Sequence, residues 1–76
     1  MSGPAQALIA LAKERPDPRA VSSWIVAYLG KRSPKDQRTV LQSLAAEFDP
    51  SRASPADARA YGLIFRVVQQ LQEKMK

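Results

Sequence analysis

In this 76-residue chain proline directly follows a small or helix-capping residue at five positions, and four of these pairs are typical of helix starts. These four pairs are Gly3-Pro4, Asp17-Pro18, Ser33-Pro34 and Ser54-Pro55. Proline at the first helical position has no amide hydrogen to lose and a suitable φ, while a preceding Asp or Ser accepts a bond from the first-turn amides. Asp36 and Asp57 add a carboxylate at the third helical position, which favours the helix dipole. Each pair therefore predicts the start of a helix.

The spacing of these pairs predicts helices near 4-15, 18-31, 34-48 and 55-75. Gly30 is expected to help end the second helix, and Asp49-Pro50 to end the third. No segment alternates between apolar and polar residues over the length of a strand, so we expect no β-sheet. The short connections suit a bundle. The sequence therefore predicts an all-α protein, a compact four-helix bundle in which residues 1-76 form a single helical domain.

Apolar residues recur at helical spacing in the first three helices and predict one buried face on each. They are Ala5, Leu8, Ile9 and Ala12 in the first, Val21, Trp24, Ile25, Tyr28 and Leu29 in the second, and Val40, Leu41, Leu44, Ala45 and Phe48 in the third. For Trp24 and Tyr28 there is an alternative, a platform on which nucleic-acid bases stack. We expect both side chains in the core.

The fourth helix carries apolar residues over about 200° of its circumference, from Ala60 to Met75. One neighbouring helix cannot cover so wide an arc. Either this helix lies in the middle of the bundle, or part of the arc binds another molecule. In the second case we expect a protein partner or a homodimer, with Leu63 and Val67 at least partly exposed. Two cations, Arg59 and Arg66, then lie at the rim of the partner-binding surface.

Positive charge is concentrated in one segment of a chain with 12 Lys and Arg, 7 Asp and Glu and a net charge of +5. Residues 31-38 contain four cations and a single carboxylate, and they surround the start of the third helix. The cations are Lys31, Arg32, Lys35 and Arg38. Side-chain cations beside the amides of a helix N-terminus predict a phosphate site. The alternative is a solvated turn that its charges keep soluble.

The chain contains no His and no Cys. Neither a Ser-His nor a Cys-His nucleophile can form, and a metal site would lack imidazole and thiolate ligands. Gly3, Gly30 and Gly62 are scattered, so no glycine-rich loop cradles a phosphate. We therefore expect no catalytic residue, no cofactor and no metal, and a non-enzymatic protein.

The longest uninterrupted apolar run extends from Ala7 to Ala12, whereas about 20 residues are needed to span a bilayer. No basic residue precedes Lys13, so we expect no signal peptide, no membrane insertion and a cytoplasmic protein. The first functional hypothesis is a small non-catalytic adaptor or regulatory module that binds a protein partner, or itself, through the apolar flank of the C-terminal helix. The alternative is nucleic-acid (DNA) binding through the basic corner at residues 31-38.

Overall fold

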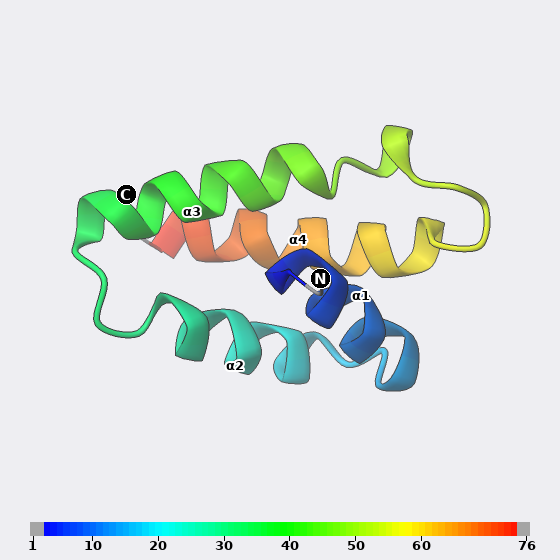
Figure 1. Ribbon diagram of the computed structural model, residues 1–76, viewed down its shortest axis with the longest axis horizontal. Helices are drawn as coiled ribbons and strands as arrows, with labels where there is room; N and C mark the ends of the chain where they lie inside the picture. Colours follow the sequence, from blue (N-terminus) through cyan, green and yellow to red (C-terminus); the bar gives the residue numbers. More distant parts are fainter. Residues whose placement is uncertain (1–2, 75–76) are drawn as a thin grey trace.

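The computed structural model describes residues 3–74 and contains four α-helices and no strand within that range. The helices are α1 (Pro4–Glu14), α2 (Pro18–Leu29), α3 (Pro34–Glu47) and α4 (Ala58–Lys74), with a short 3₁₀ helix, η1 (Pro50–Arg52), between α3 and α4 (Figure 1). The prediction of an all-α four-helix bundle is confirmed. Met75, at the end of the expected fourth helix, lies outside the described residues.

Two of the predicted helix starts are formed by the expected side-chain caps. Asp17 Oδ1 accepts a hydrogen bond of 3.0 Å from the Arg19 amide at the start of α2. Ser33 Oγ accepts a bond of 3.3 Å from the Asp36 amide at the start of α3. Because both caps precede a proline at the beginning of the helix, the two helices begin where the sequence predicts.

The fourth helix begins at Ala58, after the Ser54-Pro55 pair has formed a separate turn. The Asp57 amide donates to the Ser54 carbonyl, and the Tyr61 amide donates to the Asp57 carbonyl as α4 begins. The Ser54 hydroxyl bonds to the Asp57 carboxylate. Ser54 is therefore part of the turn before α4, and its expected role as the cap of that helix is wrong.

The Asp49-Pro50 pair ends α3, as predicted, and it also starts η1, which was not predicted. Asp49 Oδ1 accepts bonds of 3.0 Å from the Ser51 amide and 2.9 Å from the Ser51 hydroxyl. This is the same capping chemistry as at Asp17 and Ser33. The Asp49-Pro50 pair therefore both ends α3 and begins η1.

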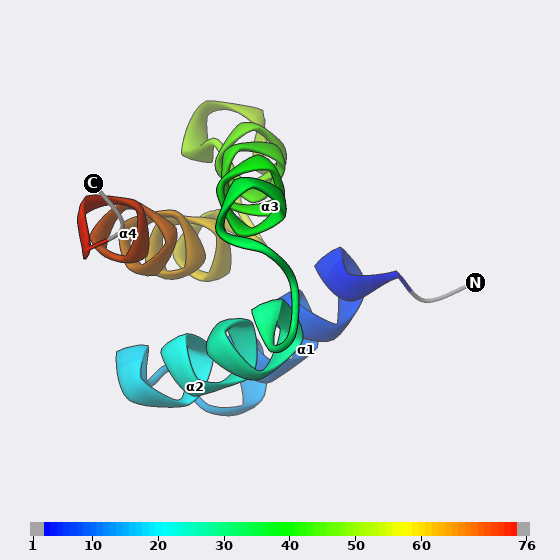
Figure 2. The ribbon, with the colours of Figure 1, turned by 90° about the vertical axis from the view of Figure 1, so that its left-hand side faces the viewer.

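Helix α4 is the central helix of the bundle because it packs against α1, α2 and α3. In both ribbon views it lies between α3 on one side and α2 on the other (Figures 1 and 2). Its buried residues are Ala60, Ile64, Val67 and Val68. Contacts on several sides account for most of the wide apolar arc, and the expectation that Val67 is partly exposed is wrong, since this side chain is 1% exposed.

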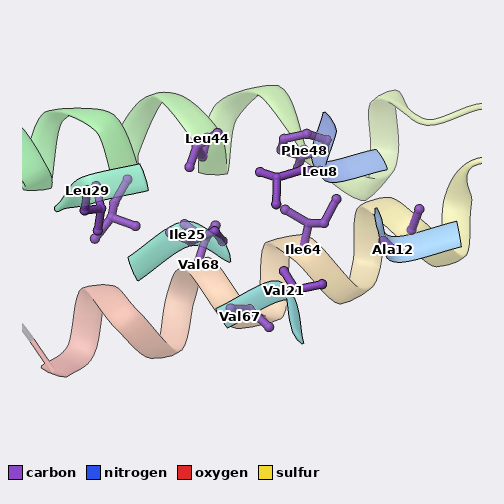
Figure 3. Close-up of a cluster of buried hydrophobic side chains, with 12 residues drawn as sticks. Leu8, Ala12, Val21, Ile25, Leu29, Leu44, Phe48, Ile64, Val67 and Val68 are labelled. Carbon is purple, nitrogen blue, oxygen red and sulfur yellow. The ribbon is translucent and has the colours of Figure 1, made fainter. Parts of the chain in front are cut away.

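All four helices contribute side chains to one hydrophobic core (Figure 3). Leu8 of α1, Ile64 of α4 and Phe48, which follows α3, are completely buried and lie close together in Figure 3. The Phe48 ring also meets the Tyr61 ring edge to face, with the centroids 5.1 Å apart. The core therefore fixes the relative positions of α1, α3 and α4.

Candidate functional site

The turn between α2 and α3 brings the predicted cations to one end of the molecule. Gly30 ends α2 with a φ of +37°, and its amide donates to the Val26 carbonyl. Lys31 and Arg32 follow in the turn, and Lys35 lies in the first turn of α3. All three side chains, and that of Arg38 one turn further on, are exposed. We call these four residues the basic corner.

An aromatic pair on α2 adjoins the basic corner. The Trp24 and Tyr28 rings are stacked, with centroids 5.3 Å apart and planes inclined by 12°. The Arg32 guanidinium lies over the Tyr28 ring, 5.2 Å from its centroid. Trp24 and Tyr28 are four residues apart on α2, and Arg32 lies in the turn after the helix, so the two rings and one cation of the corner form a row that runs from α2 into this turn.

The prediction that Tyr28 is a core residue is wrong, because it is 36% exposed. Trp24 packs partly against the core and is only partly buried. The fully buried stripe of α2 consists of Val21, Ile25 and Leu29. These three side chains pack against the neighbouring helices, and the two rings lie beside this buried stripe.

The amides at the start of α3 are mostly used within the protein. Pro34 has no amide hydrogen, the Asp36 amide donates to Ser33 Oγ, and the Gln37 amide donates to the Ser33 carbonyl. Few backbone amides at this helix start are therefore left to bind a phosphate. Any anion bound at this corner has to be held mainly by the Lys and Arg side chains.

A small groove of about 220 Å³ opens at the same end of the molecule, between α2, α3 and the last turn of α4. Its lining includes Val26, which is 53% exposed, together with Gln37, Leu71 and Lys74. The sequence did not indicate that Val26 and Lys74 lie at this end of the molecule. The antiparallel course of α3 and α4, visible in Figure 1, is the signal that would have placed Lys74 beside the start of α3.

The four residues predicted for partner binding do not form one surface. Leu63 is partly buried and lines a groove of about 500 Å³ together with Arg59, Ala12 and Pro16. Arg66 is exposed and lies beside Gln69 and Gln70 instead. Four residues rotate a helix by about 400°, so Val67 lies about 40° from Leu63 and nearer to the buried centre of the arc.

The ion pair between Lys13 and Asp57 joins the end of α1 to the start of α4. The hydrogen bond from Lys13 lowers the pKa of Asp57 below its ordinary value, against the opposing effect of desolvation. The pKa of Asp49 is also lowered, mainly by the hydrogen bonds from the backbone and side chain of Ser51. These carboxylates belong to the α1–α4 contact and to η1, so neither competes for the cations of the basic corner.

Two further observations bear on the kind of site that this chain can hold. Among residues 3–74, no cluster of three or more acidic, His or Cys side chains has the arrangement needed to hold a metal ion. None of the helices within those residues is both long and apolar enough to cross a bilayer.

None of the known protein families, curated proteins or solved structures with which the chain was compared is similar to it.

Proposed function

We propose that the protein is a non-enzymatic nucleic-acid-binding module that uses the basic corner between α2 and α3. The observation that carries this proposal is the Arg32 guanidinium over the exposed Tyr28 ring. It joins a concentrated group of cations to an aromatic pair in one surface. Cations that contact phosphates and rings that stack on bases are the two components that nucleic-acid sites combine.

The charge distribution supports the same surface. The whole chain has an excess of five positive charges, and the segment 31-38 alone has four cations against Asp36. A positive region on a protein of net positive charge attracts a polyanion over distance and raises the association rate. The proposal places the protein in the cytoplasm, where it meets nucleic acid.

The first hypothesis from the sequence, partner binding through the flank of α4, has lost most of its basis. Its main argument was an apolar arc wider than one neighbouring helix could cover. Since α4 contacts all three other helices and Val67 is buried, internal packing explains most of that arc. The basic corner has the opposite property, because its cations and Tyr28 all face solvent.

The test is fluorescence anisotropy with labelled single-stranded and duplex DNA at several salt concentrations. If all four cations reach phosphates, affinity should fall roughly 50- to 150-fold between about 50 and 200 mM salt. The double substitution Lys31→Glu/Lys35→Glu should weaken binding by at least about tenfold at low salt. If the affinity does not change with salt concentration or with this double substitution, the basic corner is refuted as the binding site.

Arg19→Glu is the control with the same change in charge as either single substitution, Lys31→Glu or Lys35→Glu. Arg19 is exposed in the first turn of α2, about 15 Å from the other end of that helix at 1.5 Å per residue. A carboxylate near a helix N-terminus is favourable, so the fold is retained. This variant should bind nearly as well as the parent protein.

A second candidate function rests on the groove that Leu63 and Arg59 line. The apolar residues Ala12, Pro16 and Ala56 share this groove, which suits an apolar side chain of a protein partner or of a second copy. Leu63→Glu should then abolish self-association in sedimentation experiments at high protein concentration, while Gln70→Glu on the exposed face of α4 should not. If the parent protein is monomeric at every concentration, self-association through this groove is excluded.

A further inference from the structure

The aromatic pair on α2 has a geometry that the phosphate contacts alone do not require. The Trp24 and Tyr28 rings lie nearly parallel, and Tyr28 is 36% exposed although α2 has a complete buried stripe without it. Rings stacked in this way cover each other's facing sides, so the area left for another flat group is the exposed part of Tyr28 and the Arg32 guanidinium over its ring. The Tyr28 ring lies directly beside one cation of the basic corner, Arg32.

Nucleic acids differ in whether they can use such a surface. In a duplex the faces of the bases are covered by their neighbours in the stack, and a protein reads only base edges and phosphates. In a single strand the bases can be splayed out and stacked on aromatic rings or on an Arg guanidinium. An exposed Tyr28 ring beside the Arg32 guanidinium therefore favours unpaired bases over a duplex.

We propose that the Trp24–Tyr28–Arg32 row binds an unpaired base of single-stranded nucleic acid by stacking, while Lys31 and Lys35 hold the adjacent phosphates. This inference rests on the function proposed above and specifies the form of nucleic acid that the site takes. Positions 24 and 28 are about 6 Å apart along α2, and the Arg32 guanidinium, in the turn after the helix, lies 5.2 Å from the centroid of the Tyr28 ring. The row ends at the turn that carries Lys31, so base and backbone contacts are adjacent.

The row could instead serve only to stabilise α2, because an aromatic pair at this spacing strengthens a helix by itself. The two roles differ in what Tyr28→Ala does. A purely structural pair changes the melting temperature and leaves the affinity of the folded protein unchanged. A stacking site loses affinity for single strands even at temperatures where the variant is fully folded.

The experiment uses Trp24, which is the only tryptophan of the chain, as the reporter. Oligothymidylate and oligouridylate of about eight nucleotides are titrated into the full chain, beside a DNA duplex of the same phosphate content. We expect both single strands to quench Trp24 emission and to bind more tightly than the duplex. A difference between the two strands shows whether DNA or RNA is preferred.

Three variants accompany this titration. Tyr28→Ala should weaken single-strand binding by about 5- to 100-fold, with duplex binding unchanged. Tyr28→Phe keeps the ring and should bind like the parent protein. Val26→Ala removes another exposed apolar group of the same helix and should have no effect on Trp24 quenching.

The outcomes separate this inference from the proposed function. If single strands and duplex bind equally and Tyr28→Ala changes neither affinity, the stacking site is refuted, while salt-dependent binding that needs Lys31 and Lys35 still supports the basic corner. If neither single strands nor duplex bind at low salt, both proposals are refuted. Selective loss of single-strand binding in Tyr28→Ala supports both.

Discussion

Leu63 and Val67 lie one helical turn apart on α4 and experience different environments. Val67 is 1% exposed within the core, whereas Leu63 lies at the wall of the groove beside α1. A carboxylate at position 67 would be buried without a partner, which costs several kcal/mol, a large part of the stability of a small domain. A carboxylate at position 63 can reach solvent through the groove.

We therefore expect Val67→Glu to unfold the protein and Leu63→Glu to leave it folded. Circular dichroism during thermal denaturation measures both. The pair is closely matched, since each substitution introduces the same charge into the same face of α4. A cooperative transition of Val67→Glu near the parental melting temperature would contradict the central position of α4.

Phe48 and Trp24 differ in burial, so replacing each with Ala should destabilise the protein by a different amount. Phe48 is completely buried against the Tyr61 ring, so Phe48→Ala should cost about 3–5 kcal/mol. Trp24 is only partly buried, so Trp24→Ala should lower the free energy of unfolding by less than Phe48→Ala does. If the Trp24 ring were fully buried, the two substitutions would have similar costs. Urea denaturation gives the two values, and a larger loss for Trp24→Ala would place that ring in the core after all.

At the scale of the helix, Gly30 and Gly62 have opposite requirements. Gly30 has a φ of +37°, and a Cβ placed there would lie 3.0 Å from the Ala27 carbonyl oxygen. Gly62 is inside α4, and a Cβ placed there meets nothing within 4 Å. The first glycine is needed to end α2, whereas the second only adds conformational freedom to the unfolded chain.

Gly30→Ala should therefore destabilise the protein by about 1–3 kcal/mol, while Gly62→Ala should stabilise it by about 0.5–1 kcal/mol. Replacing Gly with Ala should thus lower the stability at position 30 and raise it at position 62. Chemical denaturation of both variants measures the difference. A stabilised Gly30→Ala would show that the turn of the basic corner does not need a positive φ.

The helix starts illustrate which local signals suffice. Asp17 and Ser33 cap their helices as the sequence predicts because the cap and the following proline act over one turn. Ser54 does not cap α4, although it is also followed by a proline, Pro55. There the Asp57 side chain binds Lys13 of α1, a contact between helices that the local sequence does not contain.

On the scale of the whole molecule, the sequence predicts the number of helices and gives a central fourth helix as one of two explanations of its wide apolar arc, but it does not say which of its apolar residues are buried. Periodicity identifies apolar faces, and it assigned Tyr28 and Val67 to the wrong environments. Burial depends on how many neighbours a face has, and that number follows from the packing of α4 among the other helices. For the same reason Lys74, distant in sequence, was not expected beside the basic corner.

The link between α1 and α4 predicts a dependence of stability on pH. The lowered pKa of Asp57 means that its carboxylate is favoured in the folded state, so its contribution is present above about pH 4 and lost as pH falls through the folded pKa. The melting temperature should therefore fall on acidification. Asp57→Asn should show a weaker fall between about pH 5 and pH 3. Identical pH profiles for the two proteins would contradict this contribution.

The most direct test of nucleic-acid binding at the basic corner is a ¹H–¹⁵N NMR titration of the intact chain with a short oligothymidylate at low salt. The account predicts that the largest shift changes occur at the Trp24 indole, at Tyr28 and at the amides from Gly30 to Lys35. Residues around Arg59 and Leu63, on the other groove, should change little. Absence of any change, or changes centred on Arg59 and Leu63, would contradict the account.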